Sequence, residues 1–318
     1  MGKKILFLLR FKCINTMKNE IIKITTVGAI VALFAASFSS CSGESDEGKK
    51  NKSNTIDTTA ANDTAAKVKV EVDYAVPTPN ELFKIINKLD KSLDATLVND
   101  VNKSSDYVTA KKKALNFGVY TADLAYLSAF GNSADAMNYF ETIQSLGESL
   151  GISAAFDKAL VERVEENQAD ADSIFMISND TYFDTYAFLE ENDKGSILSM
   201  IIVGGWVESM YVITNLVGDY KEGDPLMEDI GDQRLVLENI LGFLEIYSDD
   251  QNVQQVTGDL FSILEAFDNM EFVEEKDVKI ENKDGVITTS GGGYYKMNEQ
   301  AFNAIKAAVA DLRNQITE

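Results

Sequence analysis

The chain of 318 residues carries 51 acidic and 29 basic side chains and contains no histidine. Because residues 1–41 hold six of the basic and one of the acidic residues, the chain after them has 23 basic and 50 acidic residues, a net charge of −27. A surface this acidic repels nucleic acid, so no nucleic-acid partner is expected, and the missing histidine excludes His-based triads and Glu-x-x-His di-iron sites.

Residues 1–41 have the pattern of a targeting segment. Lys18 and Lys23 precede the apolar run Val27–Phe38, which has the length of a signal-peptide core. The run is shorter than the ~20 residues that a membrane-crossing helix needs, which favours a cleaved signal peptide. A single N-terminal transmembrane anchor is the alternative. Met17 stands where such a peptide normally starts and is a candidate for the true first residue.

The run ends in Phe38–Cys41, with the sequence FSSC, which resembles a bacterial lipobox. Phe38 stands where a lipobox usually has Leu, a looser pattern found in lipoproteins of Bacteroidota. The resemblance implies that Cys41 is acylated and that the acyl chains are the membrane contact. The acidic run Ser42–Gly48 resembles an export tag for the outer face of the outer membrane, and reads equally well as a solvated tether. The expected location is the cell envelope, with the protein as an outer-membrane lipoprotein and surface exposure as a candidate.

Residues 42–76 are almost free of large apolar side chains and predict a disordered polar tether, because such a segment cannot bury enough surface to offset its chain entropy. The folded domain is predicted over 77–318. Its first helix begins with the capping box Thr78–Glu81, which has Pro79 at the first helical position.

Apolar residues at helical spacing predict further helices over about 104–130, 133–150, 154–167, 174–191, 197–217, 225–246 and 253–267. Gly131 and Gly151 are expected to end two of them, Ser133 to cap the third helix, and Asp224 with Pro225 to start the helix at 225.

The stretch 197–217 is apolar almost all round, with Glu208 and Asn215 as its strongly polar residues. A helix of this kind is surrounded either by other helices or by lipid. We favour a core helix in a soluble bundle, since a carboxylate at mid-span costs ~2.5 kcal/mol or more in lipid.

The helical period changes near the end of the chain. Residues 278–289 predict a small β-hairpin around Asp284–Gly285, and Gly291–Gly293 predict a hinge before the last helix. The predicted fold is therefore mainly α: a multi-helix bundle around a central apolar helix (197–217), with one small β-hairpin (278–289) before the last helix.

Two stripes of polar residues lie on helices that are otherwise apolar: Asn116, Tyr120 and Asp123 on one, and Gly204, Glu208, Tyr211 and Asn215 on the other. Paired carboxylates on core helices suit an acid/base pair or half of a metal site. We favour a structural role, with Gln233 and Arg234 as the natural partners. The candidate site is a buried polar cluster of Asp123, Glu208, Gln233 and Arg234, with no catalytic residue assigned.

Metal and cofactor motifs are weak. The two cysteines, Cys13 and Cys41, fall in the leader, so only a hard, oxygen-ligated ion would suit the domain. Asp170–Ser173 and Asp249–Asn252 lack the glycine and final glutamate of a calcium loop and are interpreted as helix caps. No metal site and no cofactor are expected.

The stretches Asn116–Tyr126 and Gly204–Tyr211 resemble segments of an uncharacterised all-helical lipoprotein family of Bacteroidota. The resemblance implies an envelope location and carries no activity to any residue. We therefore predict a non-enzymatic protein that binds an envelope protein or a small-molecule ligand, or acts as a scaffold. A histidine-free carboxylate hydrolase is the alternative, and would need Asp123 and Glu208 to face a solvent-reachable cleft.

Overall fold

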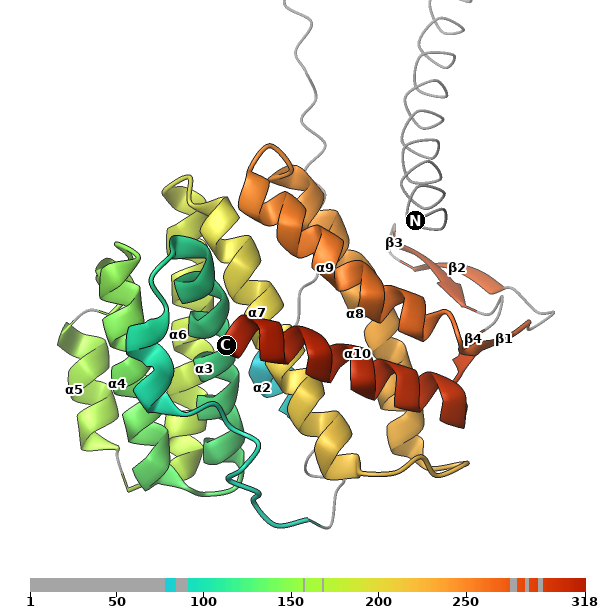
Figure 1. Ribbon diagram of the computed structural model, residues 1–318, viewed down its shortest axis with the longest axis horizontal. Coiled ribbons are helices and arrows are strands. Elements are labelled where there is room, and N and C mark those ends of the chain that lie inside the picture. Colours follow the sequence, from blue (N-terminus) through green and yellow to red (C-terminus); the bar gives the residue numbers. More distant parts are fainter. Residues whose placement is uncertain are drawn as a thin grey trace, which may run out of the picture. The chain divides into compact units, whose positions relative to one another are not determined.

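The computed structural model describes residues 78–83, 91–156, 158–167, 169–274, 279–283, 286–290 and 294–318. The α-helices in these ranges are α2 (Pro79–Phe83), α3 (Ala110–Ala129), α4 (Ser133–Ser149), α5 (Lys158–Glu166), α6 (Ala171–Glu191), α7 (Gly195–Val217), α8 (Pro225–Ile246), α9 (Gln251–Phe267) and α10 (Glu299–Thr317). They form the bundle in Figure 1, so the predicted mainly helical fold is confirmed. The predicted leader and tether, with Cys41, lie outside the described residues.

The apolar helix α7 lies at the centre of this bundle, with α3, α6, α8, α9 and α10 packed against it (Figure 1). By length and composition α7 could cross a membrane, and it is the one described helix with that property. Yet 89% of its most apolar 18-residue window is buried inside the protein. Its apolar surface is therefore covered by other helices, as the sequence predicted.

Glycines let α3 and α7 touch backbone to backbone. A Cβ atom added at Gly204 would collide with the carbonyl oxygen of Leu115, and one at Gly118 would collide with that of Ile201. Both glycines lie inside helices, where glycine is intrinsically unfavourable. Their presence is explained by this close crossing, which fixes how the polar stripes of the two helices meet.

Side-chain caps define the helix ends. Asp224 accepts a hydrogen bond from the Leu226 amide at 3.0 Å, ahead of Pro225. Asp170 and Asp250 cap α6 and α9 in the same way, which confirms the interpretation of those acidic runs as caps. The prediction that Ser133 caps α4 is wrong by one residue: Asn132 is the cap and Ser133 begins the helix.

The largest difference in a boundary is at α3. The helix predicted from residue 104 begins at Ala110, because Thr109 caps it by accepting a hydrogen bond from the Lys112 amide at 3.2 Å. Residues Val101–Asp106 form a separate 3-10 helix, η2, and a second short one, η3, covers Ser153–Ala155 ahead of α5. Residues 91–109 are therefore not part of α3, and η2 packs against α3 and α4.

Four short strands precede α10: β1 (Glu271–Val273), β2 (Lys279–Lys283), β3 (Val286–Ser290) and β4 (Tyr294–Lys296). Antiparallel pairing of β2 with β3 confirms the predicted hairpin. β1 and β4 form a second antiparallel pair that the sequence did not reveal, because three-residue strands are too short to show a period. The predicted turn at 284–285 and hinge at 291–293 lie outside the described residues.

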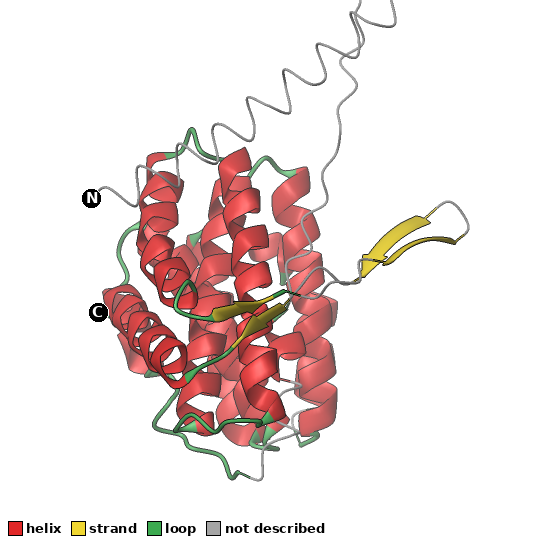
Figure 2. Ribbon diagram, turned by 90° about the vertical axis from the view of Figure 1, so that its right-hand side faces the viewer, coloured by secondary structure: helices red, strands yellow, loops and turns green. Residues whose placement is uncertain are grey.

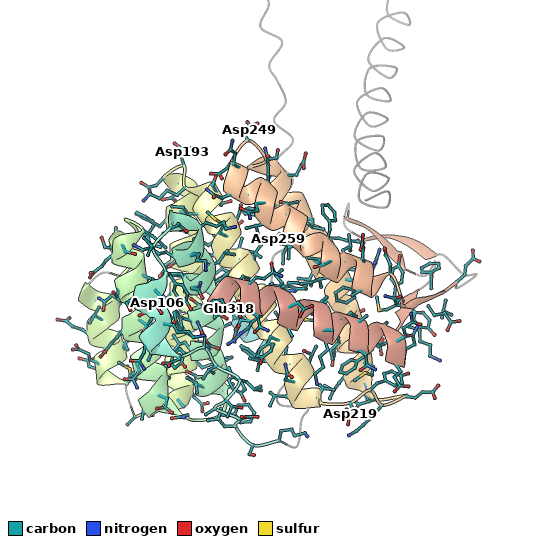
Figure 3. All side chains as sticks on the ribbon, in the orientation of Figure 1. Asp106, Asp193, Asp219, Asp249, Asp259 and Glu318 are labelled. Atoms are coloured by element: carbon teal, nitrogen blue, oxygen red, sulfur yellow. The ribbon has the colours of Figure 1, made fainter. Side chains whose placement is uncertain are left out.

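α10 crosses the bundle instead of running along it. It packs on α7 and α9, and Figures 1 and 2 show its axis turned away from those of the other long helices. The apolar stripe of α10 is buried. Figure 3 shows acidic side chains on other parts of the helical domain, among them Asp193, Asp219 and Asp249, at separate places on its periphery. The crossing brings α10 over the polar stripes of α3 and α7.

Candidate functional site: a buried carboxyl pair and a hydroxyl-lined cavity

Asp123 of α3 and Glu208 of α7 meet in the core, as the sequence analysis proposed. Both side chains are 0% exposed. The two carboxyl groups lie close enough for Glu208 to raise the pKa of Asp123, beyond the larger effect of burial. The close crossing of the two helices at Gly118 and Gly204 is what brings these side chains into contact.

The cation that neutralises the pair is Arg313 of α10. Its Nε and Nη2 atoms donate to Glu208 Oε2 and Oε1 at 3.0 and 3.1 Å, a two-point contact. The guanidinium also lies 4.7 Å from the ring centre of Tyr211, one helical turn beyond Glu208. Glu208 and Tyr211 of the polar stripe on α7 thus face α10.

The prediction that Arg234 and Gln233 pair with the carboxylates is wrong. Arg234 binds Asp268 and Glu238 near the surface, at 2.8 and 3.3 Å, and Gln233 accepts a hydrogen bond from the Trp206 indole at 3.3 Å. Both belong to α8, which packs on another side of α7. α10 closes over Glu208 instead, and its Arg313 takes the place expected for Arg234.

The sequence contains a pattern that indicates a buried role for Arg313. Arg313 stands four residues after Val309 and directly after Leu312, inside the buried stripe of α10. A lone arginine on the apolar face of a helix needs a buried acidic partner. That rule would have joined Arg313 to Glu208 or Asp123.

Of the two carboxyl groups, Asp123 is the one whose surroundings most favour the protonated form. Burial raises the pKa of Asp123 well above its ordinary value, and the neighbouring Glu208 raises it further. Burial also raises the pKa of Glu208, but Arg313 beside it opposes this rise. Asp123 Oδ2 accepts the Asn99 amide at 3.0 Å, whereas Oδ1 meets no N–H or O–H donor among the described residues. A protonated Asp123 that donates to a charged Glu208 satisfies both groups.

Asparagine and tyrosine side chains form a network of hydrogen bonds around the cluster. Asn99 donates to the Tyr107 hydroxyl at 3.0 Å, and that hydroxyl donates to the Thr317 carbonyl at 3.2 Å. Tyr139 of α4 donates to the Asn99 carbonyl at 2.7 Å, and Asn116 of α3 donates to the carbonyl of Ile316 at 2.9 Å. The network ties the segment before α3 and the end of α10 to the core.

Chemically, the cluster is a closed and neutral set of one acid, one carboxylate and one guanidinium. Neither carboxyl group is accessible to solvent, and no group of three or more metal-ligating side chains occurs in the described part of the chain. Such a set holds helices in register and offers no position for a substrate.

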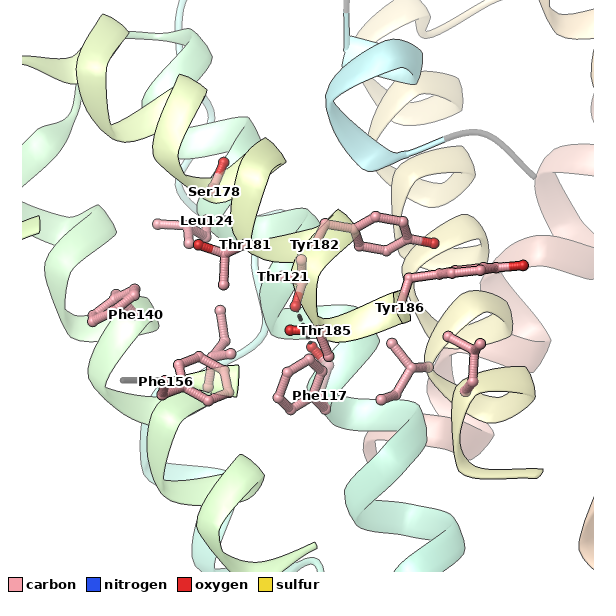
Figure 4. Close-up of a pocket in the computed structure, with 13 residues that line it drawn as sticks. Phe117, Thr121, Leu124, Phe140, Phe156, Ser178, Thr181, Tyr182, Thr185 and Tyr186 are labelled. Carbon is pink, nitrogen blue, oxygen red and sulfur yellow. Dashed lines mark hydrogen bonds between the residues drawn. The ribbon is translucent and has the colours of Figure 1, made fainter. Parts of the chain in front are cut away.

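A second feature lies on the other side of α3, between α3, α4, α6 and α7 (Figure 4). This cavity, which we call the α6 cavity, is lined by seven apolar side chains and by six that carry a hydroxyl group: Phe117, Thr121, Leu124, Phe140, Ile143, Phe156, Ser178, Thr181, Tyr182, Thr185, Tyr186, Leu198 and Ile201. The volume of the cavity is about 20 Å³, room for about one water molecule. No lining side chain is charged.

A wider and more open groove lies beside β4 and the start of α8. It measures about 370 Å³ and is lined by Tyr220, Asp224, Glu228 and Tyr294 among others. Asp224 is already used there as the cap of α8. In the same measure the groove is far larger than the α6 cavity, which holds about 20 Å³.

A scan against protein-family models and searches of the curated proteins and of the solved structures find no match to this chain.

Proposed function

We propose that the chain is a lipid-anchored protein of the cell envelope that binds a ligand or partner and has no enzymatic activity. The observation that supports the binding or scaffolding class is the closure of the carboxyl pair. Asp123 and Glu208 are 0% exposed, and Arg313 occupies both oxygens of Glu208. A carboxylate hydrolase would need both groups within reach of substrate and water, so the burial favours binding over hydrolysis.

The proposed membrane anchor is inferred from the sequence around Cys41. The apolar run Val27–Phe38 and the ending FSSC support cleavage before Cys41 and acylation of that residue. Two or three acyl chains anchor a protein stably without a spanning helix, because each buried methylene contributes ~0.8 kcal/mol. The outer membrane is the proposed location, and an uncleaved N-terminal anchor is the competing arrangement.

The proposed partner is an envelope protein or a small molecule that meets the helical domain at its surface or in a groove. The net charge of −27 after residue 41 disfavours an anionic partner. For a small molecule the groove beside β4 offers room, since its volume is about 370 Å³.

The anchor is tested by the intact mass of the protein extracted from membranes, with and without globomycin, and by protease treatment of whole cells. We expect a chain that begins at Cys41 and carries the mass of acyl groups, and a Cys41→Ala variant that lacks them. An uncleaved leader, or a chain without acyl mass, would overturn the lipoprotein proposal.

The absence of catalysis is tested by assaying the protein on chromogenic glycosides and esters, alongside Asp123→Asn and Glu208→Gln variants. We expect no turnover above buffer for any of the three. Turnover by the unmodified protein that a folded Glu208→Gln variant loses would establish the hydrolase alternative.

A further inference from the structure

The groove beside β4 combines tyrosine side chains with acidic groups. It is formed by the loop before α8, the first turn of α8 and strand β4, which packs on that helix. Its volume of about 370 Å³ lies in the range of small-molecule sites. Among its lining residues are Tyr220, Asp224, Glu228, Tyr294 and Lys296.

Two tyrosines of the groove have rings that no cation of the protein occupies. The Tyr220 hydroxyl donates to the Met297 carbonyl at 3.4 Å, which fixes the position of its ring. Tyr294 is 49% exposed. Within the described residues, the tyrosine rings that hold a guanidinium are those of Tyr211 and Tyr295. The rings of Tyr220 and Tyr294 are therefore open to a cation from outside.

The chain twice combines a tyrosine ring, a carboxylate and a cation. Arg313 lies 4.7 Å from the ring centre of Tyr211 and binds Glu208. Arg234 lies 4.7 Å from the ring centre of Tyr295 and binds two acidic side chains. The groove contains the tyrosines and the carboxylate but has no arginine in its lining. A bound organic cation supplies the missing group.

The charges in the groove also favour a cation. Glu228 forms no ion pair in the part of the chain that the structure describes. Asp224 accepts the Leu226 amide, and its charge balances the end of α8. Lys296 stands opposite Glu271 in the pairing of β4 with β1, so its charge is balanced across the strands. The excess charge is that of Glu228, in a chain whose net charge of −27 after residue 41 attracts cations.

We propose that the groove beside β4 binds a small quaternary ammonium compound, with its charged head against Tyr220 and Tyr294 and near Glu228. Such a head needs no hydrogen-bond acceptor, which suits a lining that also contains Met227 and Met297. A phosphate next to the nitrogen would be repelled by the carboxylates of the groove, so the ligand is a free cation and not a phosphocholine headgroup. This proposal rests on the binding class proposed above and adds the ligand chemistry and the site.

The test is an NMR titration of choline into the protein extracted from membranes in a non-ionic detergent. Saturation transfer to the choline methyl protons reports binding, and the detergent alone is the blank. We expect saturable binding of choline. Two analogues should bind about tenfold more weakly or not at all: dimethylbutanol, the neutral isostere in which carbon replaces the nitrogen, and phosphocholine.

Two variants locate the site. Tyr294→Leu removes a ring at an exposed position and should weaken choline binding about fivefold. Glu228→Gln removes the unpaired charge and should weaken it about threefold at an ionic strength of about 0.15 M. Glu245→Gln is the matched control, because Glu245 is an exposed glutamate near the other end of α8, about 25 Å along the helix axis. Its loss should leave the affinity unchanged.

The proposal is overturned if choline does not bind, or if dimethylbutanol or phosphocholine binds as tightly as choline. It is also overturned if either Tyr294→Leu or Glu228→Gln behaves like Glu245→Gln. Failure here with an acylated Cys41 and no turnover would leave the proposed function standing and remove only this site.

Discussion

Arg313 of α10 donates hydrogen bonds to both carboxylate oxygens of Glu208, at 3.0 and 3.1 Å. Glu208 lies 105 residues earlier in the chain. The contact joins the last helix to the middle of the central one, and Asp123 of α3 completes it from the other side. Three helices that are distant in sequence therefore share one buried proton and one buried ion pair. The predictions below follow from this arrangement and from the packing around it.

Arg313→Met should lower the free energy of unfolding by about 3–5 kcal/mol at pH 7, since it leaves the Glu208 carboxylate buried without a cation. Arg234→Met is the matched control. Its partners Asp268 and Glu238 are partly exposed, so the loss should be about 1 kcal/mol or less. Urea unfolding measures both, and equal losses would contradict the assignment of Arg313 as the buried partner.

Asp123→Asn should change how stability depends on pH. Because the pKa of Asp123 is raised in the folded protein, the folded state holds one more proton than the unfolded state from about pH 4 up to that raised pKa. The free energy of unfolding of the unmodified protein therefore falls as pH rises through this window, by up to about 1.4 kcal/mol per pH unit.

An asparagine at position 123 has no proton to lose, so the Asp123→Asn variant should lack the part of this fall that belongs to Asp123. Its stability relative to the unmodified protein should increase between pH 4 and pH 8. Urea midpoints at several pH values measure the difference, and two parallel curves would show that Asp123 carries no proton in the folded state.

Much of this arrangement was accessible from the sequence. Asp123 and Glu208 were proposed as neighbours because each is a lone carboxyl group on an apolar helix, and α7 as the central helix because it is apolar all round. Arg313, the partner of Glu208, was missed because the sequence does not show which helix crosses over Glu208. The position of α10 depends on how all the helices pack together, which no local pattern in the sequence reveals. The cavity beside Thr185 is likewise a gap between four helices, which no periodicity encodes.

Gly204→Ala should lower the free energy of unfolding by about 3 kcal/mol, because the added methyl group meets the Leu115 backbone and the two helices must separate. Gly258→Ala on α9 is the control, since nothing lies within 4 Å of a Cβ atom there. That change should raise stability by about 0.5–1 kcal/mol through helix propensity. Thermal unfolding measures both, and a stabilised Gly204→Ala variant would refute the close helix crossing.

Thr185→Val should raise the free energy of unfolding by about 1 kcal/mol, because it removes a buried hydroxyl that has no partner among the described residues. Thr181→Val, one turn earlier, removes a hydroxyl that is bonded to the Ile177 carbonyl and should bring no such gain. Urea midpoints of the two variants give the comparison. Equal effects would indicate that Thr185 has a partner in solution.

Our central proposal is that the carboxyl cluster of Asp123, Glu208 and Arg313 holds α3, α7 and α10 together and has no catalytic role. The most direct test combines Asp123→Asn, Glu208→Gln and Arg313→Met, which removes every charge of the cluster at once and leaves none unpaired. We predict a folded protein that is more stable to urea than Arg313→Met alone, since no buried carboxylate is left without a cation. A triple variant that is no more stable than Arg313→Met would contradict the proposal.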